Sequence, residues 1–178
     1  AVHSLYKPLP GRFKDYIAQV ATGETVHDLP LRLYQQEDAR FRGLEVDLEW
    51  RINELLSLRM FGDRINASLK RSGDVPRLPP SRVGVEAHLS GNQWSAYASW
   101  LHAYEQDKPG TFELPTNSWS RLEVGADYRI DVAGAGELLL FAKLRNAGDD
   151  TIRLSTSYLR GFAPEAGRSL ETGIRFRY

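Results

Sequence analysis

The feature that most constrains the fold is a strict alternation of apolar and polar residues, which recurs in four segments of the chain. Residues 82–89, 121–130 and 169–178 show it, and the clearest case is residues 44–51, where four apolar residues alternate with four charged ones: Leu44, Val46, Leu48 and Trp50 against Glu45, Asp47, Glu49 and Arg51. Successive side chains of a strand point to opposite faces, so each segment predicts a strand with one apolar face and one polar face.

Two kinds of connector separate the alternating segments. Residues 90–92 and 132–136 are short, whereas 71–80, 105–115 and 159–167 are long and polar. Alternating short and long connections predict an antiparallel up-and-down meander of about eight strands. The expected strands are at 12–21, 32–51, 56–70, 81–90, 93–105, 117–130, 137–146 and 168–178. No helix of useful length is expected, because residues 53–59 are better explained as a tight connector.

Composition excludes several classes of protein. The 178 residues contain 23 Lys and Arg, 23 Asp and Glu, and no Cys. Zero net charge gives no electrostatic basis for binding nucleic acid. The lack of Cys excludes disulfide scaffolds and thiolate metal sites. Runs of about 18 apolar residues, which a spanning helix needs, are absent, and residues 1–10 do not have the pattern of a signal peptide.

Two environments fit the alternation. In a soluble barrel or sandwich the apolar face forms the core, whereas in an outer-membrane barrel it meets lipid and the charged face lines the lumen. Long strands, charged faces of both signs and aromatic residues near strand ends favour the membrane. These aromatic residues are Trp50, Trp94, Tyr104, Trp119, Tyr128 and Tyr178. The predicted fold class is therefore all-β, an antiparallel up-and-down transmembrane β-barrel, with a soluble all-β domain as the alternative.

Five short segments in order carry a family resemblance. They are 13–17 (FKDYI), 36–45 (QEDARFRGLE), 76–82 (PRLPPSR), 144–149 (LRNAGD) and 163–169 (APEAGRS). Together they resemble the C-terminal part of the barrel of TonB-dependent outer-membrane receptors. The segments at 36–45, 76–82 and 163–169 are most similar to the branch of ZnuD-type zinc and haem receptors.

The resemblance implies a larger protein. Receptors of this family have about 22 strands around an N-terminal plug domain, whereas this sequence predicts about eight strands and no plug. Residues 1–178 are thus expected to form the C-terminal barrel segment of a receptor in the outer membrane of a Gram-negative bacterium. The full receptor would take up a metal or a metal chelate such as zinc or haem. Its expected partners are outer-membrane lipid, the barrel-assembly machinery and, in the full receptor only, the plug and TonB.

The carboxyl terminus carries a recognisable pattern. Ile174, Phe176 and Tyr178 place apolar and aromatic residues on one face of the last predicted strand. In outer-membrane proteins such a terminal aromatic pattern resembles the signal that the barrel-assembly machinery reads. We therefore expect these three residues to act as a membrane-assembly signal.

Metal ligands must come from imidazole and carboxylate groups, because Cys is absent. His27 and Asp28 lie in one expected long loop, and His102, Glu105 and Asp107 lie beside another. Both sets would be extracellular if the carboxyl terminus is periplasmic, and there they could capture a divalent cation. The spacing of His102, Glu105 and Asp107 does not place them on one strand face. No resident cofactor is expected, since zinc or haem would be cargo.

Catalytic motifs are lacking, so the chain is not expected to be an enzyme. His88 near Glu86 and Ser90 is the best dyad-like group, but a lumen histidine bonded to its neighbours explains it better. Two further functions stay open. One is a self-contained small outer-membrane barrel with a binding or adhesive role and no active transport. The other is a soluble β-barrel carrier, which is disfavoured because its interior would need the apolar face.

Overall fold

The computed structural model describes residues 25–26, 29–30, 37–71, 73–110 and 113–178. The chain divides into two units, residues 1–38 and 39–178. In the first, β1 (Thr25–Val26) pairs with β2 (Leu29–Pro30) in an antiparallel hairpin. The strand expected at 12–21 and the metal candidates His27 and Asp28 lie outside the described residues.

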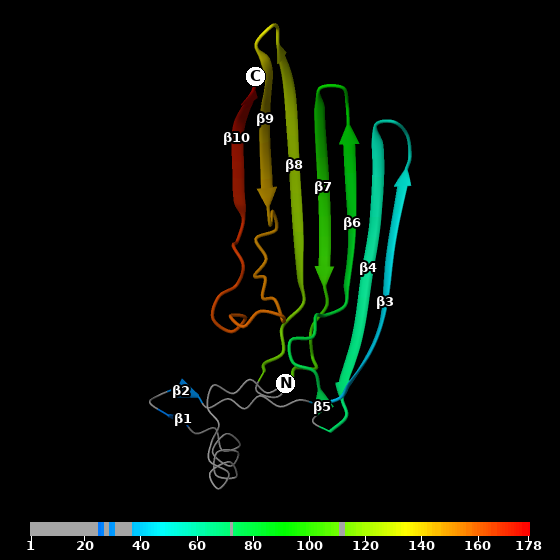
Figure 1. The fold of residues 1–178 in the computed structure, drawn as a ribbon, viewed down its shortest axis with the longest axis vertical. Coiled ribbons are helices and arrows are strands. Elements are labelled where there is room, and N and C mark those ends of the chain that lie inside the picture. Colours follow the sequence, from blue (N-terminus) through cyan, green and yellow to red (C-terminus); the bar gives the residue numbers. More distant parts are fainter. Residues whose placement is uncertain (1–24, 27–28, 31–36, 72, 111–112) are drawn as a thin grey trace. The chain divides into compact units, whose positions relative to one another are not determined.

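Residues 39–178 form one antiparallel sheet in which each long strand pairs with the next one along the chain (Figure 1). The sheet order is β10-β9-β8-β7-β6-β4-β3, and the short β5 (Gly73–Asp74) pairs with β4. The long strands are β3 (Ala39–Arg51), β4 (Leu56–Leu69), β6 (Arg82–Ser90), β7 (Trp94–Ala103), β8 (Trp119–Val132), β9 (Gly136–Arg145) and β10 (Ser169–Arg177). The predicted all-β, antiparallel, up-and-down fold is confirmed, and the described part of the chain contains no helix.

Connections of two lengths lie at opposite ends of this sheet. Residues 52–55, 91–93 and 133–135 make short turns at the end where the carboxyl terminus lies, and residues 70–81, 104–118 and 146–168 make long connections at the other (Figure 1). Hydrogen bonds from the backbone to one side chain stabilise the turn at residues 52–55. The Oδ1 atom of Asn53 accepts hydrogen bonds from the backbone N–H groups of Leu55 at 2.9 Å and Leu56 at 2.8 Å.

The pairing register separates the side chains into two faces, because directly paired residues share a face. Asp47 pairs with Phe61, and Arg59 pairs with both Glu49 and Glu86, so these residues lie on one face. On this polar face the strands β3, β4 and β7–β10 place their odd-numbered residues and β6 its even-numbered ones. The opposite positions form the apolar face. The two names are used in this sense below.

Among the described residues, the buried apolar side chains lie at the long-loop end of the sheet, where β7 ends and β8 begins. Ala103, Trp119 and Ile152 form a cluster with exposed fractions of 0%, 6% and 1%. The carbonyl of Leu78 accepts hydrogen bonds from Gln106 Nε2 at 2.8 Å and from Ser155 Oγ at 3.0 Å. The three long connections therefore meet at one carbonyl and pack into a small core of their own, which we call the loop cluster.

Aromatic rings cover glycines across neighbouring strands on the polar face. The directly paired residues are Phe61 with Gly84, Tyr97 with Gly125 and Phe141 with Gly173. A Cβ atom added to any of these glycines would overlap the ring. Glycine at these positions therefore allows each ring to lie flat over the neighbouring strand, a device that fixes register in curved sheets.

We expect Gly125→Ala to destabilise the sheet by about 1–3 kcal/mol, because the Tyr97 ring must leave its position. Urea unfolding of the folded chain measures the effect. Gly148→Ala is the matched control, since a Cβ atom at Gly148 would meet nothing within 4 Å. Equal unfolding midpoints for the two variants would contradict the role of the ring.

Candidate functional site

The apolar face exposes large hydrophobic side chains on six of the seven long strands, and those of β9 on this face are half-buried. They are Leu44, Val46, Leu48, Trp50, Met60, Val83, Val85, Trp94, Trp100, Leu122, Tyr128, Ile130, Val132, Leu170, Ile174 and Phe176. Soluble monomers rarely expose contiguous apolar patches larger than a few hundred Å². A surface that crosses seven strands therefore needs an apolar environment. No helix long and apolar enough to span a membrane occurs in the described part of the chain.

Aromatic side chains mark both ends of the apolar face. Trp50, Trp94 and Tyr128 lie near the short-turn end, where Trp94 and Tyr128 are directly paired. Tyr104 follows β7 at the long-loop end. Amphipathic rings at two levels are typical of the two interfaces of a membrane. Trp119 differs from the expectation, because it lies on the polar face and is buried in the loop cluster.

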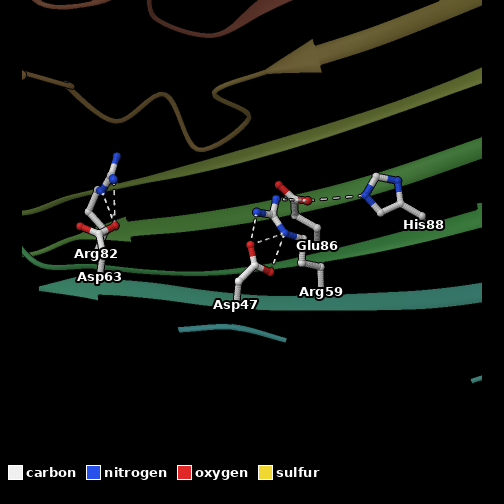
Figure 2. A network of polar contacts seen from close by, with 6 residues as sticks. All are labelled: Asp47, Arg59, Asp63, Arg82, Glu86 and His88. Atoms are coloured by element: carbon white, nitrogen blue, oxygen red, sulfur yellow. Dashed lines mark hydrogen bonds and ion pairs between the residues drawn. The ribbon is translucent and has the colours of Figure 1, made fainter. Parts of the chain in front are cut away.

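Charged side chains on the polar face are paired across three strands (Figure 2). Arg59 on β4 places Nη2 2.5 Å from Asp47 Oδ2 on β3 and Nη1 3.4 Å from Glu86 Oε2 on β6. A second pair joins the Nη2 atom of Arg82 to Asp63 Oδ1 at 2.8 Å. Each link follows from the register, which sets an arginine directly opposite or diagonal to a carboxylate.

The pairing continues toward β10. Arg121 lies 3.5 Å from Glu123 and 3.4 Å from Glu165, and Arg145 lies 2.9 Å from Glu171. The carboxyl side of this face therefore also holds both signs of charge next to each other. The polar face as a whole carries both signs of charge without a large excess of either, which suits the lining of a lumen.

His88 belongs to this wall. Its Nε2 atom lies 3.6 Å from Glu86 Oε2 (Figure 2). Its ring stacks on Tyr97 with centroids 6.1 Å apart. Ser90 shares the face, two residues further along β6. The arrangement fits a lumen histidine held by its neighbours, which was the preferred interpretation of the sequence.

His102, the metal candidate in β7, lies on the apolar face. Its Nδ1 atom is 2.9 Å from Ser120 Oγ, and its ring stacks on Trp100 and meets the edge of Tyr104. Glu105 and Asp107 flank the buried Gln106 and are exposed. In the ranges that the structure describes, no group of three or more His, Asp or Glu side chains could hold a metal ion. Metal capture by these residues stays a prediction.

The terminal pattern is accessible. Ile174 and Phe176 are 72% and 49% exposed on the apolar face of β10, and Tyr178 is fully exposed after the strand. An assembly factor could therefore reach all three side chains. Their role as an assembly signal stays a prediction.

Sequence reasoning missed the pairing of rings with glycines and the loop cluster. A signal for the first was present, because Gly84, Gly125 and Gly173 all occupy polar positions of alternating segments. The loop cluster depends on contacts between connections far apart in the chain, such as Ser155 with Leu78. Its residues show no local pattern.

A comparison with solved structures supports the architecture. The chain is similar to the copper transporter OprC with a TM-score of 0.67 and 18% identity, over 80% of this chain and 24% of that one. At this identity the likeness shows the fold alone, and this chain spans about a quarter of the length of the transporter. No family model and no curated protein matches the chain.

Removing one partner of the pair between Asp47 and Arg59 should destabilise the sheet, because the remaining side chain loses the opposite charge beside it. We expect Asp47→Asn and Arg59→Gln each to lower the urea midpoint, and the double variant to lose less than the sum of the two. The coupling should shrink in concentrated salt, since the pair is accessible to water. Additive effects at low salt would contradict the pairing.

Proposed function

We propose that residues 1–178 form the C-terminal barrel segment of a TonB-dependent outer-membrane receptor that takes up a metal or a metal chelate. The observation that carries the proposal is the two-faced sheet. Its long strands have 9 to 14 residues, and about 9–11 are needed to cross a bilayer at a tilt. The exposed apolar face would meet lipid, and the ion-paired face would line the lumen.

The topology supports an orientation. Outer-membrane barrels have short periplasmic turns and long extracellular loops. The short turns and the carboxyl terminus of this sheet would then be periplasmic, and the loop cluster extracellular. In that position the barrel-assembly machinery could bind Ile174, Phe176 and Tyr178 from the periplasm.

The edges of the sheet support its being part of a larger barrel. Within the described residues, β3 and β10 each pair on one side only. Unpaired strand edges are costly in lipid, because backbone N–H and C=O groups find no water there. Further strands of the same receptor would satisfy both edges, and a plug and TonB would supply gating.

The nature of the cargo rests on likeness. The sequence resembles zinc and haem receptors, and the fold is similar to that of a copper transporter. Both point to metal uptake without enzymatic chemistry, with zinc, copper and haem as the cargoes to test.

A self-contained small outer-membrane barrel is the second candidate, and the loop cluster is the observation that favours it. Loops packed around a buried core can present a fixed surface to a partner. An open reading frame for a plug directly upstream of the codon for Ala1 would exclude this candidate. A chain that stays folded and monodisperse without detergent would exclude both candidates.

Adjacent residues of β7 test which face meets lipid. Ala98 lies on the apolar face between Ala87 and Val124, whereas Ser99 lies on the polar face between Glu86 and Glu123. We expect Ala98→Arg to cost about 2–4 kcal/mol of folding free energy in a bilayer, the range for Arg at the midplane. Ser99→Arg should be tolerated, because two carboxylates flank it.

Heat-modifiable gel mobility of outer-membrane fractions measures the folded share of each variant. The two substitutions differ only in the face they alter, so each serves as the control of the other. Equal tolerance of both variants would argue against a lipid-facing apolar surface.

Uptake tests the transport function directly. Cells that make the full receptor should accumulate labelled zinc, copper or haem only when TonB is functional. Replacing His27 and His102 by Ala should lower accumulation of the free metal ions if these residues capture cations at the surface. Unchanged accumulation in this variant would contradict that role, and accumulation independent of TonB would contradict the transport mechanism.

A further inference from the structure

Charge on the apolar face is confined to one corner. Along the seven long strands this face carries three arginines, Arg40, Arg42 and Arg64, and no carboxylate. Their register places Arg64 opposite Leu44, Arg42 opposite Asn66 and Arg40 opposite Ser68. Arg42 and Arg64 are thus diagonal neighbours, about 7–8 Å apart. All three side chains are exposed at the long-loop end of β3 and β4. We call them the arginine corner.

A ring of interfacial cations would have a different distribution. Long basic side chains commonly reach from the edge of a lipid-facing surface toward water. At the long-loop end of the other strands, however, this face carries uncharged residues or histidine: Val83, His102, Ser120, Leu144 and Leu170. No ion pair joins the three guanidinium groups to another residue of the described ranges. The positive charge is therefore local and open to a ligand.

A mainly apolar hollow lies directly beside the corner. It has a volume of about 420 Å³ and is lined by apolar residues, Arg64, Ser81 and the ion pair of Asp63 with Arg82. The apolar residues are Leu44, Val46, Gly62, Val83 and Tyr104. Gly62 pairs directly with Val46 on one side and Val83 on the other, and it has no side chain to fill the floor of this shallow groove, which Val83 borders closely. The groove therefore continues from the arginines along the apolar face.

We propose that the arginine corner and this groove bind a phosphorylated lipid of the outer leaflet. Guanidinium groups match phosphate oxygens in geometry and charge, and the groove would take part of an acyl chain. Tyr104 suits the boundary between the two, because its ring is apolar and its hydroxyl can bond a headgroup. A free phosphate ion would make no use of the groove. The inference rests on the proposed orientation, in which the long loops are extracellular.

Native mass spectrometry of the receptor in detergent, with lipid A as the probe, tests the proposal. We expect the triple variant Arg40→Gln, Arg42→Gln, Arg64→Gln to retain lipid A at least about tenfold more weakly, given the usual contribution of each basic residue near an anionic membrane surface. The control is Arg129→Gln, Arg175→Gln, Arg177→Gln, which removes the same charge from the polar face and should retain lipid A like the unaltered receptor.

Ligand variants make the test independent of any mutant that fails to fold. Dephosphorylated lipid A and the deacylated sugar phosphate should each bind the unaltered receptor more weakly than lipid A. Equal retention of the dephosphorylated lipid would overturn the role of the arginines, and displacement of lipid A by inorganic phosphate alone would overturn the assignment to a lipid.

Heat-modifiable mobility of the same samples separates this proposal from the proposed function. A triple variant that inserts normally and retains lipid A fully would overturn only the lipid site. A receptor that never enters the outer membrane would overturn the proposed function.

Discussion

Cross-strand hydrogen bonding is the interaction on which the rest of this structure depends. The sheet has no buried apolar core within its span, because most large side chains of its apolar face are exposed and its polar face carries many charged residues. In hydrocarbon, however, a paired backbone is the main requirement, since an unpaired N–H or C=O group costs several kcal/mol. Pairing from β3 to β10 meets this requirement everywhere except at the two edge strands. In the proposed receptor, further strands would meet the same requirement at both edges.

Side-chain contacts refine what the backbone pairing establishes. On the polar face, the rings of Phe61, Tyr97 and Phe141 each cover a glycine of the next strand, and a shift of one residue would move every ring to the other face. At the long-loop end, the carbonyl of Leu78 joins two other connections. Ordinary close packing thus occurs where the chain leaves the sheet, and the half-buried pair of Arg160 with Glu113 at 3.3 Å adds to it.

The strands and their faces were predictable because a period of two is a local property of the sequence. The bounds of β4 and β6 differ from the expected ones by one residue at one end, and β9 is displaced by one residue. Features that depend on register between strands were not predictable in this way. Trp119 was expected at a membrane interface. It is an odd-numbered residue of β8, however, so it lies on the polar face, where the loop cluster buries it. His102 is two residues from both Trp100 and Tyr104, and residues two apart in a strand share a face. Its position on the apolar face was therefore predictable from the sequence.

The arginines of this sheet lie in two different environments, one on each face. On the polar face Arg59, Arg82, Arg121 and Arg145 each lie next to a carboxylate, so the wall compensates its own charge. On the apolar face of the long strands the arginine corner shares its face with no carboxylate, so no residue of that face compensates its charge. A wall that neutralises itself exerts little long-range attraction on a cation, because opposite charges a few ångströms apart cancel at a distance. Selection of a metal cargo by a receptor built on this sheet would therefore depend mainly on its loops and plug, while the strands themselves would separate lipid from the lumen.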